Sequence, residues 1–290
     1  MKKLLYQFDT DALPSVFDNV VGFDGGADHI SAYGGVNAKN VGGLVEGAIF
    51  TRGLKDKKNT AIFVGGGNMT EGEAVLAAIR KKFFAKFRVS VMFDCNGCNT
   101  TAAAAVAWLA HGRPLAGKRA VVLGGSGPVG QRAAVLLARE GADVAITGRK
   151  LAVVQAACDS IQAQFGIALR AVEAPTNTER GAAVEGAQIV LATGAAGITL
   201  LDEKQWQDST TLELVADVNA SPPAGIQGVG QNDRGAPKHG KLLFGALAGQ
   251  ANAQLSTQPR ETQPLPQALE KLLLRHVHRR LLGWHVSHYR

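Results

Sequence analysis

The sequence predicts an α/β protein of two domains, because short apolar runs alternate with helical segments along most of its 290 residues. A chain of this length can build two hydrophobic cores. The Gly- and Pro-containing stretch His111–Gly117 is typical of a link between domains. We therefore expect one α/β domain over residues 1–112 and a second over residues 113–250 with a parallel sheet.

The first domain is predicted from alternating apolar runs and helical periodicity. We expect a helix from Asp11, as its N-cap, to Asn19, and a helix over Glu71–Phe84 that ends near two lysines, where the helix dipole favours cations. The remaining elements are strands at Lys3–Phe8, Ala61–Val64 and Val89–Phe93 and an alanine-rich helix at Thr100–Ala110.

The second domain opens with an apolar run around residues 120–123 that leads into a glycine-rich turn and a helix. In this turn Gly125 permits a tight bend, Gly127 lets the backbone approach a pyrophosphate, and Gly130 lets the helix pack closely on the strand. The pattern predicts a Rossmann-type sheet that binds the diphosphate of a dinucleotide at the start of the helix. The predicted contacts are Gly125, Ser126, Gly127, Pro128, Val129 and Gly130.

The next strand indicates which dinucleotide binds. An NAD site usually carries Asp or Glu about 20 residues after the glycine motif, where the carboxylate accepts from the ribose 2′-OH. Here the strand ends in Gly148, Arg149 and Lys150. A guanidinium and an ammonium pair with the 2′-phosphate of NADP, so we expect NADP as the cofactor.

Further strand–helix alternation completes the second domain. Thr193 and Gly194 follow one predicted strand and should lie near the nicotinamide ribose, while Asp217 and Asn219 follow the next and are placed to reach the carboxamide. Trp206 is expected on the surface. The remaining elements are helices at Val153–Phe165 and Thr178–Val184 and strands at Leu169–Ala174, Ile189–Thr193 and Glu213–Ala216.

Composition favours a cytoplasmic enzyme. Three cysteines cannot form a disulfide framework, and no stretch approaches the roughly 18 apolar residues of a membrane span. Of the net charge of +7, four charges lie in residues 251–290, a segment with six Lys/Arg against two Glu and four of the seven His. The remainder of the chain is only mildly basic, so we expect neither a nucleic-acid partner nor a membrane partner.

Several segments resemble one known family. Leu5–Asp11, Gly25–Ile30 and Thr60–Gly66 in the first domain are similar to bacterial methylene-tetrahydromethanopterin dehydrogenases, above all to the NADP-dependent form of methylotrophs, which also accepts methylene-tetrahydrofolate. Asp217–Pro223 and Phe244–Leu247 continue the resemblance in the second domain. The resemblance implies two α/β domains with a cleft, a pterin bound at the N-terminal domain and NADP at the Rossmann domain. It also implies a homo-oligomer and a role in one-carbon oxidation.

The implied reaction moves a hydride from the methylene carbon to nicotinamide and leaves a methenyl cation. It releases no proton, so it needs alignment and negative potential rather than a general base. The catalytic residues are unknown. Among five aspartates of the first half, Asp9 and Asp94 each follow a predicted strand, and Asp24 flanks a glycine loop that could lie against the pterin. The other two candidates are Asp18 and Asp28.

Cys95 and Cys98 have the Cys-x-x-Cys spacing of a redox pair or half a zinc site. Only Cys158 remains elsewhere, so we expect no metal and assign the pair to a helix-opening turn.

Other functions stay open. A shikimate dehydrogenase-like NADP oxidoreductase would need a Lys/Asp acid–base pair, for which Lys39 and Lys57 are available. A non-catalytic NADP-binding protein is the third possibility. The resemblance ends after Leu247, where the composition changes abruptly. Either a shift of reading frame or a different C-terminal segment would produce that change, so residues 251–290 are an atypical tail.

Overall fold

The computed structural model describes residues 1–247 of the chain, and the tail from residue 251 lies outside them. These residues divide into a first unit, Met1–Gly97, and a second unit that begins at Cys98. The prediction of an α/β fold with parallel sheets is confirmed, while the cleft between domains stays a prediction. Within residues 1–247, no helix has both the length and the apolar composition needed to cross a bilayer.

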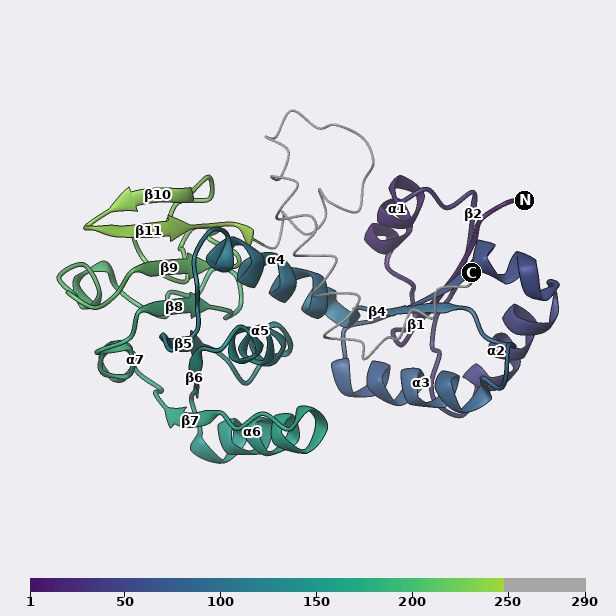
Figure 1. The fold of residues 1–290 in the computed structure, drawn as a ribbon, viewed down its shortest axis with the longest axis horizontal. Coiled ribbons are helices and arrows are strands. Elements are labelled where there is room, and N and C mark those ends of the chain that lie inside the picture. The colour runs from purple at the N-terminus through teal and green to yellow at the C-terminus, as the bar shows by residue number, and fades with distance from the viewer. Residues whose placement is uncertain (248–290) are drawn as a thin grey trace. The chain divides into compact units, whose positions relative to one another are not determined.

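The first unit is a four-stranded parallel sheet with the order β2-β1-β3-β4 (Figure 1). Helices α2 and α3 pack side by side on one face of it, and α1 lies on the other. The strands are β1 (Leu4–Asp9), β2 (His29–Tyr33), β3 (Thr60–Gly65) and β4 (Ser90–Phe93), and the helices are α1 (Val16–Asp24), α2 (Val41–Phe50) and α3 (Met69–Lys82). Two short 3₁₀ helices, Leu54–Asn59 and Cys95–Gly97, flank β3 and β4.

Local capping decides where the helices of this unit begin. Asp11 does not cap α1 as predicted. Ser15 does, because its hydroxyl accepts from the Asp18 amide, and the Asp11 carboxylate instead accepts from the amide of Gly67 (2.9 Å). Helix α3 begins after Asn68, whose side chain accepts from two first-turn amides. Strand β2 and helix α2 were not predicted, since β2 is a short edge strand and α2 contains three glycines, which disfavour helix.

The second unit is a seven-stranded sheet with the order β10-β11-β9-β8-β5-β6-β7, parallel except for β10. From β7 to β11 this is the doubly wound order of a dinucleotide-binding sheet, whose direction of progression reverses between β5 and β8. The strands are β5 (Arg119–Leu123), β6 (Asp143–Gly148), β7 (Arg170–Glu173), β8 (Ile189–Ala192), β9 (Leu214–Asp217), β10 (Arg234–Lys238) and β11 (Lys241–Phe244).

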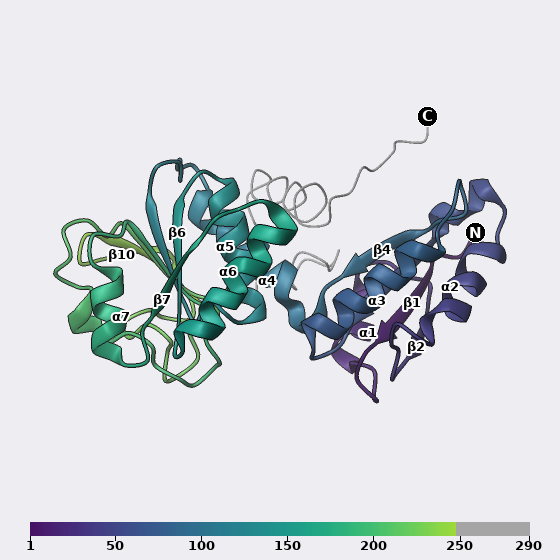
Figure 2. The same ribbon diagram turned by 90° about the horizontal axis from the view of Figure 1, so that it is seen from below.

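Helices cover both faces of this sheet. Figure 2 shows α4 (Cys98–Ala110), α5 (Pro128–Arg139) and α6 (Leu151–Phe165) together on one side, and α7 (Asn177–Val184) lies on the other. On the α7 side, Trp206 next to the 3₁₀ turn Glu203–Gln205 is fully buried and donates its ring N–H to the Gln227 carbonyl (3.1 Å). Its predicted surface position is therefore wrong.

The boundary between the units also differs from the prediction. Helix α4, expected in a first domain that ends at residue 112, belongs to the second unit. Its alanines from Ala102 to Ala107 are fully buried in the same hydrophobic cluster as Leu136 and Leu137 of α5. Alanine side chains allow two helices to approach closely, so α4 is part of the second core.

Candidate functional site

The turn from β5 to α5 has no room for side chains at two of its glycines. A Cβ on Gly125 would lie 2.6 Å from the Cβ of Ile146 in β6. A Cβ on Gly130 would lie 2.6 Å from the Cα of Gly125 and 2.7 Å from the hydroxyl oxygen of Thr193. Both distances are far below a normal carbon contact of about 3.5–4.0 Å. Glycine at these positions therefore brings the start of α5 directly against the strands.

The start of α5 is open to an anion. Gly127 is the N-cap and offers no side-chain acceptor, and Pro128 occupies the first helical position. The amides of the first turn have no partner inside the helix. Gln131 fixes the turn from behind by donating its side-chain N–H to the Ser126 carbonyl (2.7 Å). Unpaired amides and the positive end of the helix dipole suit the diphosphate of a dinucleotide.

The ends of β8 and β9 lie beside this turn. The Thr193 amide and hydroxyl both donate to the Leu123 carbonyl, at 2.9 and 3.0 Å. A Cβ on Gly124 would lie 3.2 Å from the Gly194 nitrogen, and the Asn219 side chain donates to the Gly194 carbonyl (2.8 Å). Three predicted cofactor residues, Thr193, Gly194 and Asn219, are thus gathered around the glycine turn.

Asp217 has a different place. It is 1% exposed, and its two carboxylate oxygens accept from the amides of Asn219 (3.0 Å) and Ile226 (3.2 Å). Both oxygens are therefore engaged in holding the loop after β9. The structure gives Asp217 a positioning role behind Asn219 rather than a surface from which to reach a carboxamide.

The predicted 2′-phosphate residues lie together at the end of β6. The hydroxyl oxygen of Ser126 is 3.2 Å from where a Cβ on Gly148 would stand, so the two segments touch. Arg149 and Lys150 are exposed, and within residues 1–247 neither side chain makes a hydrogen bond or an ion pair. Lys150 is the N-cap of α6, and its own side chain makes no capping hydrogen bond. Arg149, Lys150 and the start of α6 thus follow directly after the strand end that touches the glycine turn.

In the first unit, Asp9 is buried at the carboxyl end of β1. One carboxylate oxygen accepts from the Asp11 amide (2.9 Å). The other accepts from the Ser15 amide (3.0 Å) and from the side-chain nitrogen of Gln7 (3.4 Å). These bonds fix the loop between β1 and α1. Asp9 is placed where the sequence predicted, but its oxygens already have partners.

Asp18 is the carboxylate that sequence reasoning undervalued, because it follows no strand. Gly65 is the last residue of β3, and a Cβ on it would lie 3.3 Å from a carboxylate oxygen of Asp18 and 3.6 Å from one of Asp9. Burial raises the pKa of the Asp18 carboxyl, the negative charge of Asp9 adds to the rise, and a hydrogen bond with Ser15 opposes it. Two carboxylates therefore meet at the carboxyl edge of the first sheet.

Asp94 and Asp24 lie at different edges of this sheet. Asp94 directly follows β4, is 7% exposed, and donates its amide to the Val64 carbonyl (3.0 Å), which places it at the carboxyl edge. Asp24 is the last residue of α1. The loop that follows it lies beside the start of β1, because the Asp28 carboxylate accepts from the Lys3 amide (2.7 Å). Asp24 therefore lies towards the amino edge and does not join Asp9, Asp18 and Asp94.

The two lysines considered for acid–base chemistry lie at opposite edges of the first sheet. Lys57 precedes β3, is buried, and donates to the carbonyls of Ile49 and Arg52, so it closes the end of α2 at the amino edge. Lys39 is exposed in the loop after β2. A Lys/Asp pair built on Lys57 is therefore not present at the carboxyl edge.

Cys95 and Cys98 stand at the turn that opens α4, and both thiols are buried and unbridged. Within residues 1–247, no three His, Cys, Asp or Glu side chains form a group able to hold a metal ion.

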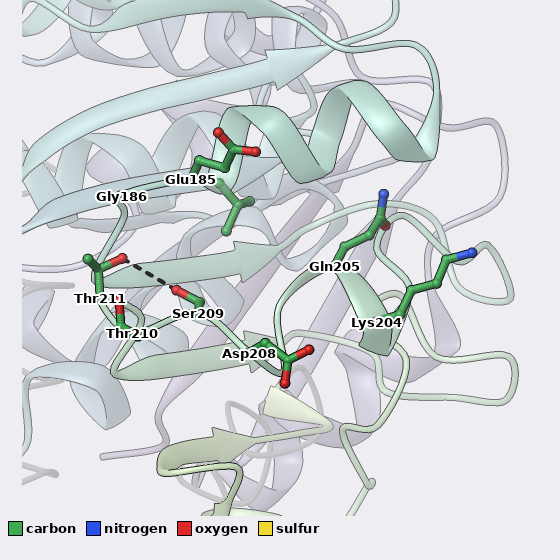
Figure 3. A pocket seen from close by; sticks show the side chains of 9 residues that line it. Glu185, Gly186, Lys204, Gln205, Asp208, Ser209, Thr210 and Thr211 are labelled. Carbon is green, nitrogen blue, oxygen red and sulfur yellow. Dashed lines mark hydrogen bonds between the residues drawn. The ribbon is translucent and has the colours of Figure 1, made fainter.

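A hollow also lies on the second unit (Figure 3). It is formed before the strands β8 and β9 begin, at the opposite edge of the sheet from the glycine turn. Its walls come from the segments that precede β8 and β9, with Ser209 and Thr211 hydroxyls 3.4 Å apart. The lining residues are Val184, Glu185, Gly186, Lys204, Gln205, Asp208, Ser209, Thr210 and Thr211. In parallel sheets of this kind, ligands bind at the carboxyl ends of the strands, so this hollow is not the dinucleotide site.

Comparison with solved structures agrees with the fold. The chain is similar to a 5-ketofructose reductase from Gluconobacter sp. strain CHM43 in its ligand-free form, with a TM-score of 0.50 and 15% identity over 94% of this chain and 98% of that one. At this identity the likeness concerns the fold alone.

Sequence comparison goes further. Residues 16–96 match the family model for the N-terminal part of methylene-tetrahydromethanopterin dehydrogenase. The chain is 55% identical over 248 residues to the bifunctional protein MdtA of Methylorubrum extorquens, covering 85% of this chain and 86% of that protein. It is 34% identical over 269 residues to the NAD(P)-dependent methylenetetrahydromethanopterin dehydrogenase of the same organism, covering 90% of each. The resemblance seen in the sequence is confirmed, and the chain belongs to the family of methylene-tetrahydromethanopterin dehydrogenases.

Proposed function

We propose that this protein is an NADP-dependent dehydrogenase that oxidises methylene-tetrahydromethanopterin, methylene-tetrahydrofolate or both to the methenyl form in one-carbon metabolism. The observation that carries the proposal is family membership combined with the glycine turn and the basic pair at Arg149 and Lys150. We further propose that the enzyme works in the cytoplasm as a homo-oligomer, with the pterin bound at the first unit and NADP at the second.

The residues of the second unit fit NADP. The first turn of α5 would offer amides to the diphosphate, and Ser126, Arg149 and Lys150 would hold the 2′-phosphate. Thr193, Gly194 and Asn219 lie beside the turn, where the nicotinamide half of the cofactor would extend. Bound NADP supplies the hydride acceptor, the nicotinamide C4.

The first unit would supply the electrostatics of the reaction. Loss of a hydride leaves positive charge on the pterin, and carboxylates near that charge stabilise it. Asp9, Asp18 and Asp94 lie at one edge of the sheet, which makes this edge the proposed place of the pterin. Since Asp9 holds backbone amides, Asp18 is a stronger candidate than Asp9 to face the charge.

Turnover tests the function directly. Formation of reduced nicotinamide would be followed by absorbance with NADP and each methylene-pterin, and with NAD in parallel. Turnover with NADP and either pterin is the expected result. Tight NADP binding without turnover would instead favour the non-catalytic alternative, and a rate that requires an ionisable lysine would favour a shikimate dehydrogenase-like reaction.

Replacing Arg149 tests the cofactor assignment. Arg149→Ala removes a charge-assisted bond to the 2′-phosphate worth about 1.5–3 kcal/mol, so NADP should bind roughly tenfold or more weakly while NAD is nearly unchanged. Arg149 is exposed and makes no ion pair within residues 1–247, so the fold should be unaffected. Titration of intrinsic fluorescence with each dinucleotide would measure both constants, and equal losses for NADP and NAD would contradict the assignment.

A further inference from the structure

The structure places a carboxylate beside the basic pair, where the sequence shows none. Strand β6 ends without Asp or Glu, but its neighbour β7 ends in Glu173. The parallel register of β6 and β7 sets Glu173 opposite Gly148. The pairing of two strands thus brings a carboxylate to the site from a residue 25 positions further along the chain than Gly148.

Glu173 is held at the start of α6. One of its carboxylate oxygens accepts from the Leu151 amide at 3.2 Å, and Leu151 is the first residue of α6, directly after Arg149 and Lys150. The Ala174 amide donates to the Gly148 carbonyl at 2.8 Å, which fixes the backbone on both sides. The carboxylate is exposed and makes no ion pair with either cation within residues 1–247. Its second oxygen remains available to solvent or a ligand.

The charge of Glu173 acts oppositely on the two dinucleotides. A 2′-phosphate placed near Arg149 and the start of α6 would meet a like charge, which weakens NADP binding. A ribose 2′-OH at the same place finds an acceptor, the role that a carboxylate at the end of the second strand plays in NAD sites. Arg149 and Lys150 favour the phosphate, so the site contains elements for both cofactors.

We infer that Glu173 is a specificity-determining residue of the dinucleotide site, whose carboxylate reduces the preference for NADP over NAD. The inference rests on the proposed function, because it needs a dinucleotide bound at the glycine turn.

The test is Glu173→Gln, which removes the charge but keeps an oxygen acceptor for the Leu151 amide. Dissociation constants for NADP and NAD would be measured by fluorescence titration at low and high salt. We expect the ratio of the NAD constant to the NADP constant to rise about three- to tenfold at low salt, through loss of repulsion and of the 2′-OH acceptor. High salt should shrink the part due to repulsion.

A matched control is Glu185→Gln. Glu185 is exposed in the same unit and carries the same charge, but it precedes β8 and lies at the opposite edge of the sheet. It should leave the ratio unchanged. An unchanged ratio in Glu173→Gln, or an equal change in both variants, would overturn the inference.

Arg149→Ala distinguishes a failure of this inference from a failure of the cofactor assignment. If Arg149→Ala abolishes the NADP preference while Glu173→Gln does nothing, the inference fails and the cofactor assignment stands. If the unmodified protein binds neither dinucleotide, both fail.

Discussion

Gly130→Ala tests the close approach on which the dinucleotide site depends. The added methyl would stand 2.6 Å from the Cα of Gly125 and 2.7 Å from the hydroxyl oxygen of Thr193. One neighbour is backbone in the same turn and the other is a hydroxyl bonded to the Leu123 carbonyl, so neither can simply rotate away. To reach normal contact, the start of α5 must move by about 1 Å.

The magnitude follows from this displacement. Overpacking of one methyl costs about 1–3 kcal/mol, and the better helix propensity of alanine returns only about 0.5–1 kcal/mol of it. The displaced first turn would also lose alignment with the diphosphate. Loss of one charge-assisted hydrogen bond corresponds to roughly tenfold weaker NADP binding.

Gly47→Ala is the matched control for this prediction. Gly47 lies inside α2 of the first unit, and a Cβ there would meet nothing within 4 Å. The same substitution should therefore stabilise its unit by about 0.5–1 kcal/mol and leave NADP binding unchanged. Urea unfolding followed by circular dichroism and by tryptophan fluorescence, together with NADP titration, measures both effects. If Gly130→Ala matches Gly47→Ala in stability and affinity, the steric argument is refuted.

Two other carboxylates give predictions about stability. Burial, together with the charge of Asp9, raises the pKa of Asp18, so its ionisation opposes folding. The contribution of Asp18 to stability should therefore fall as pH rises above the ordinary value of 3.8 and through the raised pKa. In urea unfolding, the stability of Asp18→Asn relative to wild type should increase from acid to neutral pH. A constant difference across this range would contradict the raised pKa. Asp217→Asn replaces one buried acceptor with a donor that faces the Asn219 or Ile226 amide. The free energy of unfolding should fall by about 1–3 kcal/mol, which tryptophan fluorescence in urea would measure. Full stability with lost cofactor binding would instead indicate that Asp217 contacts the cofactor directly.

The dinucleotide-binding part of the second unit could be predicted because its signals are local, whereas strands β10 and β11 were not predicted. The glycine turn, the strand before it and the basic pair after the next strand all follow from short stretches of sequence, and the structure places them together. Glu173 could not be found in this way. Its position beside Gly148 depends on the register between β6 and β7, which no short pattern specifies.

The first unit was also predicted incompletely, for related reasons. Its edge strand β2 has only five residues, and α2 has glycines at Gly42, Gly43 and Gly47 where helix formers are usual. Helix α4 follows the first sheet in sequence, yet its side chains complete the core of the second unit. Which core a helix joins depends on tertiary packing, and its own alanine-rich pattern fits either.

The aspartates show why position along the chain is not sufficient to assign a catalytic role. Asp9 and Asp217 are each the last residue of a strand, and both are buried with their oxygens bonded to backbone amides of the next loop. A carboxylate with these partners stabilises the loop that presents other residues to a ligand. Asp18 reaches the same edge from a helix, and within residues 1–247 its carboxylate accepts from no backbone amide of a neighbouring loop. Burial disfavours its charge in the absence of a cation. A positive pterin placed there would relieve that cost, which is the property required of a group that stabilises a developing cation.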